Sequence, residues 1–236
     1  GVFNIRGDYN KIIRSGFEDG QSPTGTGECA IAWIADESSH SLVEDSWIWG
    51  MGRIGLFSAY TSRGGTDHII FRRVVVRLDD TPGFWVSAGL LFYGADTNIC
   101  QNCLVIDSTP NPASNNTGAF ETVKYAANTS WNGSIALNNT NWWGFYPQNT
   151  LLTSLIKDSI FWDNGVYGWG VMANSGGTFN VNHVTLGSNG NTGFQNWSGH
   201  PAIENISNSI SVNNANYGFA YIDSINTVNV YGNTNG

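Results

Sequence analysis

The sequence predicts an all-β chain wound into a parallel β-helix, a solenoid of about nine coils. One observation is a repeat in which an apolar anchor follows a polar residue by two positions, mostly every 24 to 31 residues. A second is that the segments around the anchors alternate or are rich in β-branched and aromatic residues, which indicates strands. A third is the lack of a helical pattern between them, which excludes βαβ units. The anchors are Phe17, Trp47, Val75, Leu104, Ile135, Ile160, Val184, Ile210 and Val228.

Each coil is expected to contain two or three short strands. The strands around the anchors include residues 46–49, 74–76, 103–106, 159–162 and 209–212. A second set of strands begins at a glycine, at residues 55–57, 89–92, 118–120, 144–146, 170–172, 193–194 and 218–220. Turns rich in Gly, Asn and Asp separate these strands. In such a solenoid, residues one coil apart lie about 4.8 Å from each other.

The polar residues that precede the anchors by two positions indicate a turn repeated in every coil. They are Ser15, Asp45, Arg73, Asn102, Gly133, Asp158, Asn182, Asn208 and Asn226. Asparagines at equivalent turns can also stack in hydrogen-bonded ladders. The best candidates are Asn182, Asn208 and Asn226, with a second row at Asn164, Asn189 and Asn214. The alternative is that these asparagines serve only as turn residues.

Residues 4–20 (NIRGDYNKIIRSGFEDG) and 206–214 (ISNSISVNN) resemble repeats of the right-handed parallel β-helix superfamily, the pectate-lyase-like fold. The resemblance covers nearly the whole chain and implies a single right-handed β-helix domain over residues 1–236. Polysaccharide lyases and hydrolases of this fold place acids, arginines and sometimes calcium on a solvent-facing strand surface. Because no capping segment is recognisable at either end, we expect a trimmed piece or an assembly subunit of a larger secreted protein.

Composition limits the partners of the chain. Charged residues make up 12% and apolar residues 41%, and the net charge is −8 with a pI near 4.7. An acidic chain lacks electrostatic attraction to nucleic acid, and no apolar run is long enough to cross a bilayer. We therefore expect neither nucleic acid binding nor membrane insertion. The resemblance and the low charge indicate an extracellular or cell-surface location. Cys29, Cys100 and Cys103 are expected to be buried thiols rather than a zinc or redox motif.

Stacking of the coils predicts one cluster of charged side chains. The columns combine Asp45, Arg73 and Asn102 in one and Asp19, Trp49 and Arg77 in the next. Cleavage of a uronide or glycosidic bond needs a base or an acid pair, and cations that neutralise a carboxylate. The candidate catalytic residues are Asp45, Arg73, Arg77, Asp79 and Asp80, with calcium as the cofactor if the protein is a lyase. The alternative is a set of cross-coil ion pairs without a catalytic role.

Aromatic residues make up 13% of the chain and include ten tryptophans. Exposed rings among polar residues can stack on pyranose faces or dock a protein subunit. The candidate rings for glycan or partner binding are Trp49, Trp131, Trp142, Trp143, Trp169 and Trp197. Trp47 and Phe92 are expected in the coil interior instead. His40 and His68 are expected at a turn of successive coils, either as polar turn residues or as a two-histidine metal site.

Two functions of different class fit these patterns. The first is an extracellular structural or binding module, such as a surface, filament or adhesin-like protein, that contacts glycans or neighbouring subunits through exposed aromatic rings. The alternative is a polysaccharide lyase or glycoside hydrolase that uses the Asp/Arg cluster of the early coils. The catalytic motifs of polygalacturonases and pectate lyases are absent from the sequence, which favours the first function.

Overall fold

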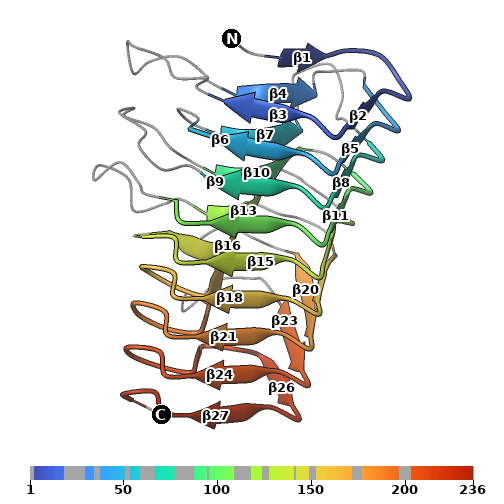
Figure 1. The fold of residues 1–236 in the computed structure, drawn as a ribbon. Coiled ribbons are helices and arrows are strands. Elements are labelled where there is room, and N and C mark those ends of the chain that lie inside the picture. Colours follow the sequence, from blue (N-terminus) through green and yellow to red (C-terminus); the bar gives the residue numbers. More distant parts are fainter. Residues whose placement is uncertain are drawn as a thin grey trace.

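The protein consists of three parallel β-sheets, and the strands of each sheet stack along one common axis (Figure 1). The computed structural model describes residues 3–18, 30–34, 38–50, 54–58, 67–77, 88–94, 96–108, 118–123, 128–140, 142–148, 153–171, 177–196 and 203–235. Within these residues the chain forms strands and turns, and none of them belongs to a helix that could span a membrane. The predicted parallel β-helix is confirmed.

Sheet A contains the first strand of each coil, the set that was expected to begin at a glycine. All of its neighbouring strands are parallel, and each pairs with its equivalent one coil away. In sheet order the strands are β1 (Phe3–Ile5), β4 (Ala30–Ile34), β7 (Ile54–Ser58), β10 (Ala88–Tyr93), β13 (Gly118–Val123), β16 (Trp143–Gln148), β19 (Trp169–Val171), β22 (Phe194–Asn196) and β25 (Phe219–Ala220).

Sheets B and C supply the second and third strands. Sheet B consists of β2 (Lys11–Ile13), β5 (Leu42–Glu44), β8 (Ile70–Arg72), β11 (Ile99–Gln101), β14 (Ser130–Asn132), β17 (Ser154–Lys157), β20 (Thr178–Asn182), β23 (Ile203–Ser207) and β26 (Ser224–Asn226). Sheet C consists of β3 (Gly16–Glu18), β6 (Trp47–Trp49), β9 (Val75–Arg77), β12 (Leu104–Ile106), β15 (Ile135–Leu137), β18 (Ile160–Trp162), β21 (Thr185–Gly187), β24 (Ile210–Val212) and β27 (Asn229–Tyr231). Figure 1 shows sheet C as the front layer, with the chain descending from the N-terminus to the C-terminus.

Inward side chains of the three sheets form one continuous apolar core. Rings from neighbouring coils pack against each other, with ring centres 4.9 Å apart for Phe71 and Phe92 and 4.8 Å apart for Phe92 and Trp131. Phe92 is fully buried, as predicted, and Cys100 and Cys103 are buried free thiols. Burial of such large rings from the third coil onward supplies much of the stabilising free energy of the solenoid.

One residue in the left-handed backbone conformation joins sheet B to sheet C in each coil. These residues are Arg14, Asp45, Arg73, Asn102, Gly133, Asp158, His183, Asn208 and Thr227, with φ between 47° and 62°. The predicted turn column is therefore confirmed at six of its nine positions. It is wrong by one residue at Ser15, Asn182 and Asn226. The single left-handed residue makes the corner tight, so that the residue after it points into the core.

A ladder of buried asparagines lies between sheets C and A. Asn139, Asn164, Asn189 and Asn214 each donate from Nδ2 to Oδ1 of the asparagine one coil further, over 2.8 to 3.2 Å, and the row ends at Asn233. Asn164 and Asn189 also donate to the carbonyl oxygens of Ala136 and Phe161. The predicted second row is thus confirmed. The first row is wrong, because Asn182 donates to Ser207 and Asn226 accepts from Thr227.

Six of the nine predicted anchors lie in one column but point outward, whereas Phe17, Val184 and Val228 are one residue out of that column and lie on the core side. Trp47 pairs with Val75, and Val75 pairs with Leu104, as the repeat requires. Trp47 is 41% exposed, whereas its neighbour Ile48 is buried. The expectation that Trp47 fills the coil interior is therefore wrong. Both faces of these three-residue strands carry apolar side chains, so alternation in the sequence does not identify the inner face.

Candidate functional site

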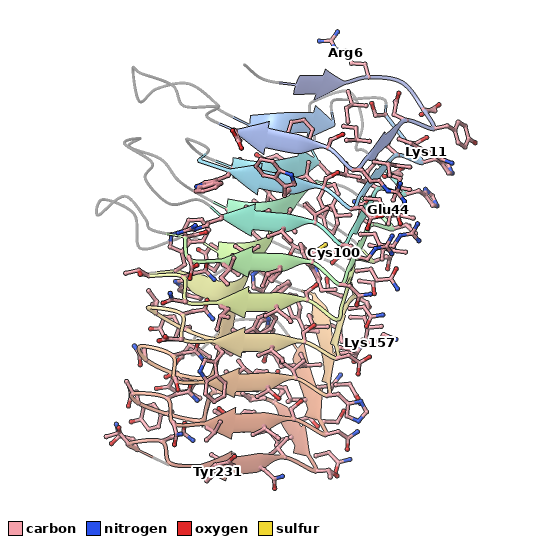
Figure 2. All side chains as sticks on the ribbon, viewed as in Figure 1. Arg6, Lys11, Glu44, Cys100, Lys157 and Tyr231 are labelled. Atoms are coloured by element: carbon pink, nitrogen blue, oxygen red, sulfur yellow. The ribbon has the colours of Figure 1, made fainter. Side chains whose placement is uncertain are left out.

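The predicted Asp/Arg cluster is an ion-pair network at the corner between sheets B and C. Arg73 binds Asp45 with two hydrogen bonds, from Nε to Oδ1 at 2.6 Å and from Nη2 to Oδ2 at 3.1 Å. Glu44 accepts a hydrogen bond from Arg72 Nε at 2.6 Å and another from Arg73. Figure 2 shows Glu44 on the same side of the solenoid as Lys11 and Lys157. Two arginines of one coil therefore bind two acids of the coil before it.

This network holds both acids in their charged form. The hydrogen bond from Arg72 lowers the pKa of Glu44 below its usual value, and the hydrogen bond from Arg73 lowers the pKa of Asp45. Asp45 raises the pKa of Arg73 in return. An efficient general acid or base needs a pKa near the working pH. Neither carboxylate meets that condition, so the network fits cross-coil pairing better than proton transfer.

Arg77 lies on a different surface from this network. It ends strand β9 on the outer face of sheet C, with its guanidinium 5.2 Å from the ring centre of Trp49. Its Nε is 3.9 Å from Asp107 Oδ2. Trp49 pairs with Arg77 as predicted, but the residue paired with Trp49 in the first coil is Glu18 and not Asp19. Asp19, Asp79 and Asp80 lie outside the described residues.

The outer face of sheet C carries several exposed apolar side chains. Trp47, Trp49, Val75 and Ile160 are each 40 to 47% exposed. Half-buried aliphatic residues fill the strands between them, namely Leu104, Ile106, Ile135 and Leu137. Apolar patches of this extent are uncommon on soluble proteins and indicate an interaction surface.

Two indole rings on this face each extend over a glycine of the neighbouring strand. Trp47 lies over Gly16, where a Cβ atom would overlap the six-membered ring. Trp162 lies in the same way over Gly187. Trp47 is 41% exposed and Trp162 is half-buried. We call these two partly exposed rings the platforms.

Most of the predicted binding rings are not on the surface. Trp131, Trp142 and Trp169 are fully buried and Trp143 is 3% exposed. Trp143 packs against Tyr146 and Tyr167, with ring centres 4.5 and 4.6 Å away. These four tryptophans offer no ring face to a ligand, so their expected exposure is wrong. Trp49 is exposed as expected, and Trp197 lies outside the described residues.

His40 and His68 lie on successive coils at the corner between sheets A and B, as predicted. Their rings are parallel within 3° and their centres are 4.6 Å apart. Parallel rings direct equivalent nitrogen atoms alongside each other rather than toward one ion. In the described part of the chain, no group of three His, Cys, Asp or Glu side chains could hold a metal. The two histidines therefore form a stacked pair at this corner.

No family model matches the chain, and no curated protein matches its sequence. Two solved structures are similar to this chain. The first is the A-module of the mannuronan C-5 epimerase AlgE4 of Azotobacter vinelandii, with 14% identity, a TM-score of 0.41, and coverage of 100% of this chain and 80% of that chain. The second is a double mutant of the periplasmic alginate epimerase AlgG, with 10% identity, a TM-score of 0.35, and coverage of 98% of this chain and 75% of that one.

This chain is a parallel β-helix protein. Its sheet topology decides that on its own, and the likeness to the two structures concerns the fold. The activity of this β-helix protein has to be argued from its own residues.

Sequence reasoning places Trp47 in the core, because an isolated tryptophan gives no sign of which face of a strand it occupies. A usable signal lies one coil away. Gly16 and Gly187 pair with Trp47 and Trp162, and a glycine beside a tryptophan on a sheet face indicates that the ring covers it.

Proposed function

We propose that this β-helix protein is an extracellular module that binds polysaccharide along the outer face of sheet C. The observation that supports this most strongly is the pair of partly exposed indole rings, Trp47 and Trp162, each lying over a glycine of the neighbouring strand. The C–H face of a pyranose stacks on an aromatic ring that is open to solvent.

The position of the two platforms suits a chain-like ligand. Strands β6 and β18 are four steps apart in sheet C, which corresponds to about 19 Å at the usual strand spacing. Aliphatic side chains form a continuous surface between them. A polymer lying along the solenoid axis would contact both rings, whereas a monosaccharide would reach only one.

Polar groups for sugar hydroxyls flank this surface. The left-handed corner residues Asp45, Arg73, Asn102, Asp158 and His183 lie directly before the strands of sheet C. Asp158 and His183 are exposed neighbours, with Oδ1 and Nδ1 3.4 Å apart. A glycan bound beside this corner would stack on the rings and form hydrogen bonds at its edge.

Binding is tested by affinity electrophoresis and calorimetry of the purified chain against uronate and neutral polysaccharides. Trp47→Ala and Trp162→Ala should each weaken binding at least several-fold, and the double variant should abolish it. Tyr217→Ala is the matched control, because Tyr217 is 42% exposed but lies outside sheet C. Unchanged affinity in the double variant would contradict the proposal.

A second candidate is a polysaccharide lyase or glycoside hydrolase with Asp45, Arg73, Arg77, Asp79 and Asp80 as catalytic residues. The observation in its favour is that Asp45 and Arg73 are partly exposed, at 33% and 48% of their side chains, next to the strand that carries Trp47. The same panel, extended to mannuronan and supplied with calcium, tests it. Unsaturated products absorbing in the ultraviolet, new reducing ends or an altered uronate composition would establish catalysis.

A neighbouring protein subunit is the other partner that could occupy the sheet C face. Sedimentation of the chain without glycan distinguishes this case, because a subunit contact would produce concentration-dependent assembly that Trp47→Ala and Trp162→Ala disrupt. A monomer that binds polysaccharide supports the module proposed above.

A further inference from the structure

A buried carboxylate lies inside the solenoid near its C-terminal end. Glu204 in β23 pairs with Phe179 in β20, and both side chains are fully buried. One coil before Phe179, the equivalent position is Ser154, which is also buried. Glu204 therefore occupies an inward column that elsewhere holds an aromatic ring or a small hydroxyl. Ionised side chains are almost never found in such positions without a partner.

One oxygen of this carboxylate and the side-chain oxygen of Asn196 accept no hydrogen bond. Asn196 Nδ2 donates to Glu204 Oε2 over 2.8 Å. The remaining oxygens, Glu204 Oε1 and Asn196 Oδ1, are buried and have no hydrogen-bond partner. Buried acceptors without a donor are costly and rare. The two unpartnered oxygens therefore call for a proton or a cation.

A second carboxylate adds negative charge at the same place. Asp223, in the following coil, accepts a hydrogen bond from the backbone N–H of Glu204 at 3.3 Å. Among the described residues after 128, the basic side chains are Lys157 and His183. Lys157 is the last residue of β17 and points outward from sheet B. His183 is exposed at the corner between sheets B and C. Neither reaches into the core to neutralise Glu204.

We propose that Glu204, Asn196 and Asp223 form a binding site for a hard metal cation, with Ca²⁺ as the best fit. Carboxylate and amide oxygens are the ligands that Ca²⁺ prefers, and the absence of His and Cys from this group disfavours zinc. Asp223 is exposed, so water can complete the coordination from its side.

The site is independent of the polysaccharide surface, because it lies between sheets A and B of the last coils and not on sheet C.

The experiment is thermal unfolding of the full chain after chelation, titrated with Ca²⁺ at pH 8, together with calorimetric measurement of Ca²⁺ binding. Ca²⁺ should raise Tm, since a ligand that binds only the folded state stabilises it. Glu204→Gln keeps the shape and the hydrogen bond from Asn196 but should lose the response.

Two further variants keep the test decisive. Asp223→Asn changes an exposed residue, so it should fold normally and bind Ca²⁺ several-fold more weakly. Asp158→Asn removes an exposed acid at the corner between sheets B and C and should leave the response unchanged. A wild-type protein whose Tm does not change with Ca²⁺ at pH 8, or a Glu204→Gln variant that still responds, would overturn the proposal.

Discussion

The indole ring of Trp47 lies over Gly16 of the preceding coil, and Trp162 repeats this arrangement over Gly187 of the following coil. Each ring takes the space that a side chain at the glycine would need. The glycine thereby determines where the ring lies. Polysaccharide binding on sheet C should consequently depend on residues that never touch the ligand.

Gly187→Val tests this dependence. The Cβ atom of the new side chain would overlap the ring of Trp162, so the ring has to leave the strand surface. We expect a several-fold loss of polysaccharide affinity and a change in tryptophan fluorescence, with little loss of folding stability because the ring lies on the outer face. Thr185→Val, at another outward position of the same strand, is the control and should retain affinity. Normal affinity of Gly187→Val would show that the ring of Trp162 is not the binding platform.

The asparagine ladder should be a major source of stability. Asn189 accepts from the backbone N–H and Nδ2 of Asn164 at Oδ1 and donates to Asn214 and to the carbonyl of Phe161. Asn189→Ala removes these bonds and leaves buried polar groups without partners, so the free energy of unfolding should fall by about 2 to 4 kcal/mol. Urea denaturation measures the change.

A matched change on the surface separates the ladder from the turn preference of asparagine. Asn205 is exposed in sheet B and donates to Asn180. Asn205→Ala should alter the free energy of unfolding by less than about 1 kcal/mol. Equal losses in the two variants would contradict a special role of the buried row.

The acidic network predicts a loss of stability in acid. Hydrogen bonds from arginines lower the pKa of Glu44 and Asp45 in the folded state below their usual values of 4.5 and 3.8. The stabilisation is therefore complete above these values and disappears as the pH falls through the folded-state pKa values. Arg73→Gln should be less stable than the wild type at pH 7, and the difference should vanish in strong acid.

Urea denaturation of both proteins across this pH range measures the effect. Arg6→Gln is the control, because Arg6 is an exposed residue of the first coil. A stability difference for Arg73→Gln that persists unchanged below the two pKa values would indicate that Arg73 acts through packing and not through its charge.

Glu204 predicts the opposite pH dependence in the metal-free protein. Its pKa is raised to about 8 in the folded state from 4.5, so the folded chain holds a proton that the unfolded chain releases between these values. Stability should decline as the pH rises from about 4.5 to 8 and level off above that range. Glu204→Gln, which does not titrate, should lack this decline when unfolding is followed after chelation.

The repeat in the sequence was sufficient to find the columns but not their direction. Trp47, Val75, Leu104, Ile135 and Ile160 do stack on one another, as their spacing requires. Spacing along the chain sets which residues become neighbours when strands pair in parallel. A strand of three residues between two corners, apolar on both faces, carries no information on which face is inside.

The charged cluster shows the same division at the level of a site. The sequence brought Asp45 and Arg73 together correctly, because they are turn residues of successive coils. Glu44 and Arg72 were missed, although Arg73 also donates to Glu44 and Arg72 binds Glu44. Nothing in the sequence distinguishes an outward strand residue from an inward one. Arg77 was placed with them but lies on another sheet, beyond the corner.

The order of polar and apolar residues by itself determined that this chain is a parallel β-helix and which residues of neighbouring coils touch. Only the tertiary structure decided that Trp131 is buried while Trp47 lies open over Gly16, and that Glu204 is enclosed beside Asn196. The physical reason is that the spacing of the sequence repeat reflects the number of residues in each coil. The burial of a side chain depends instead on how the three sheets close around a common axis.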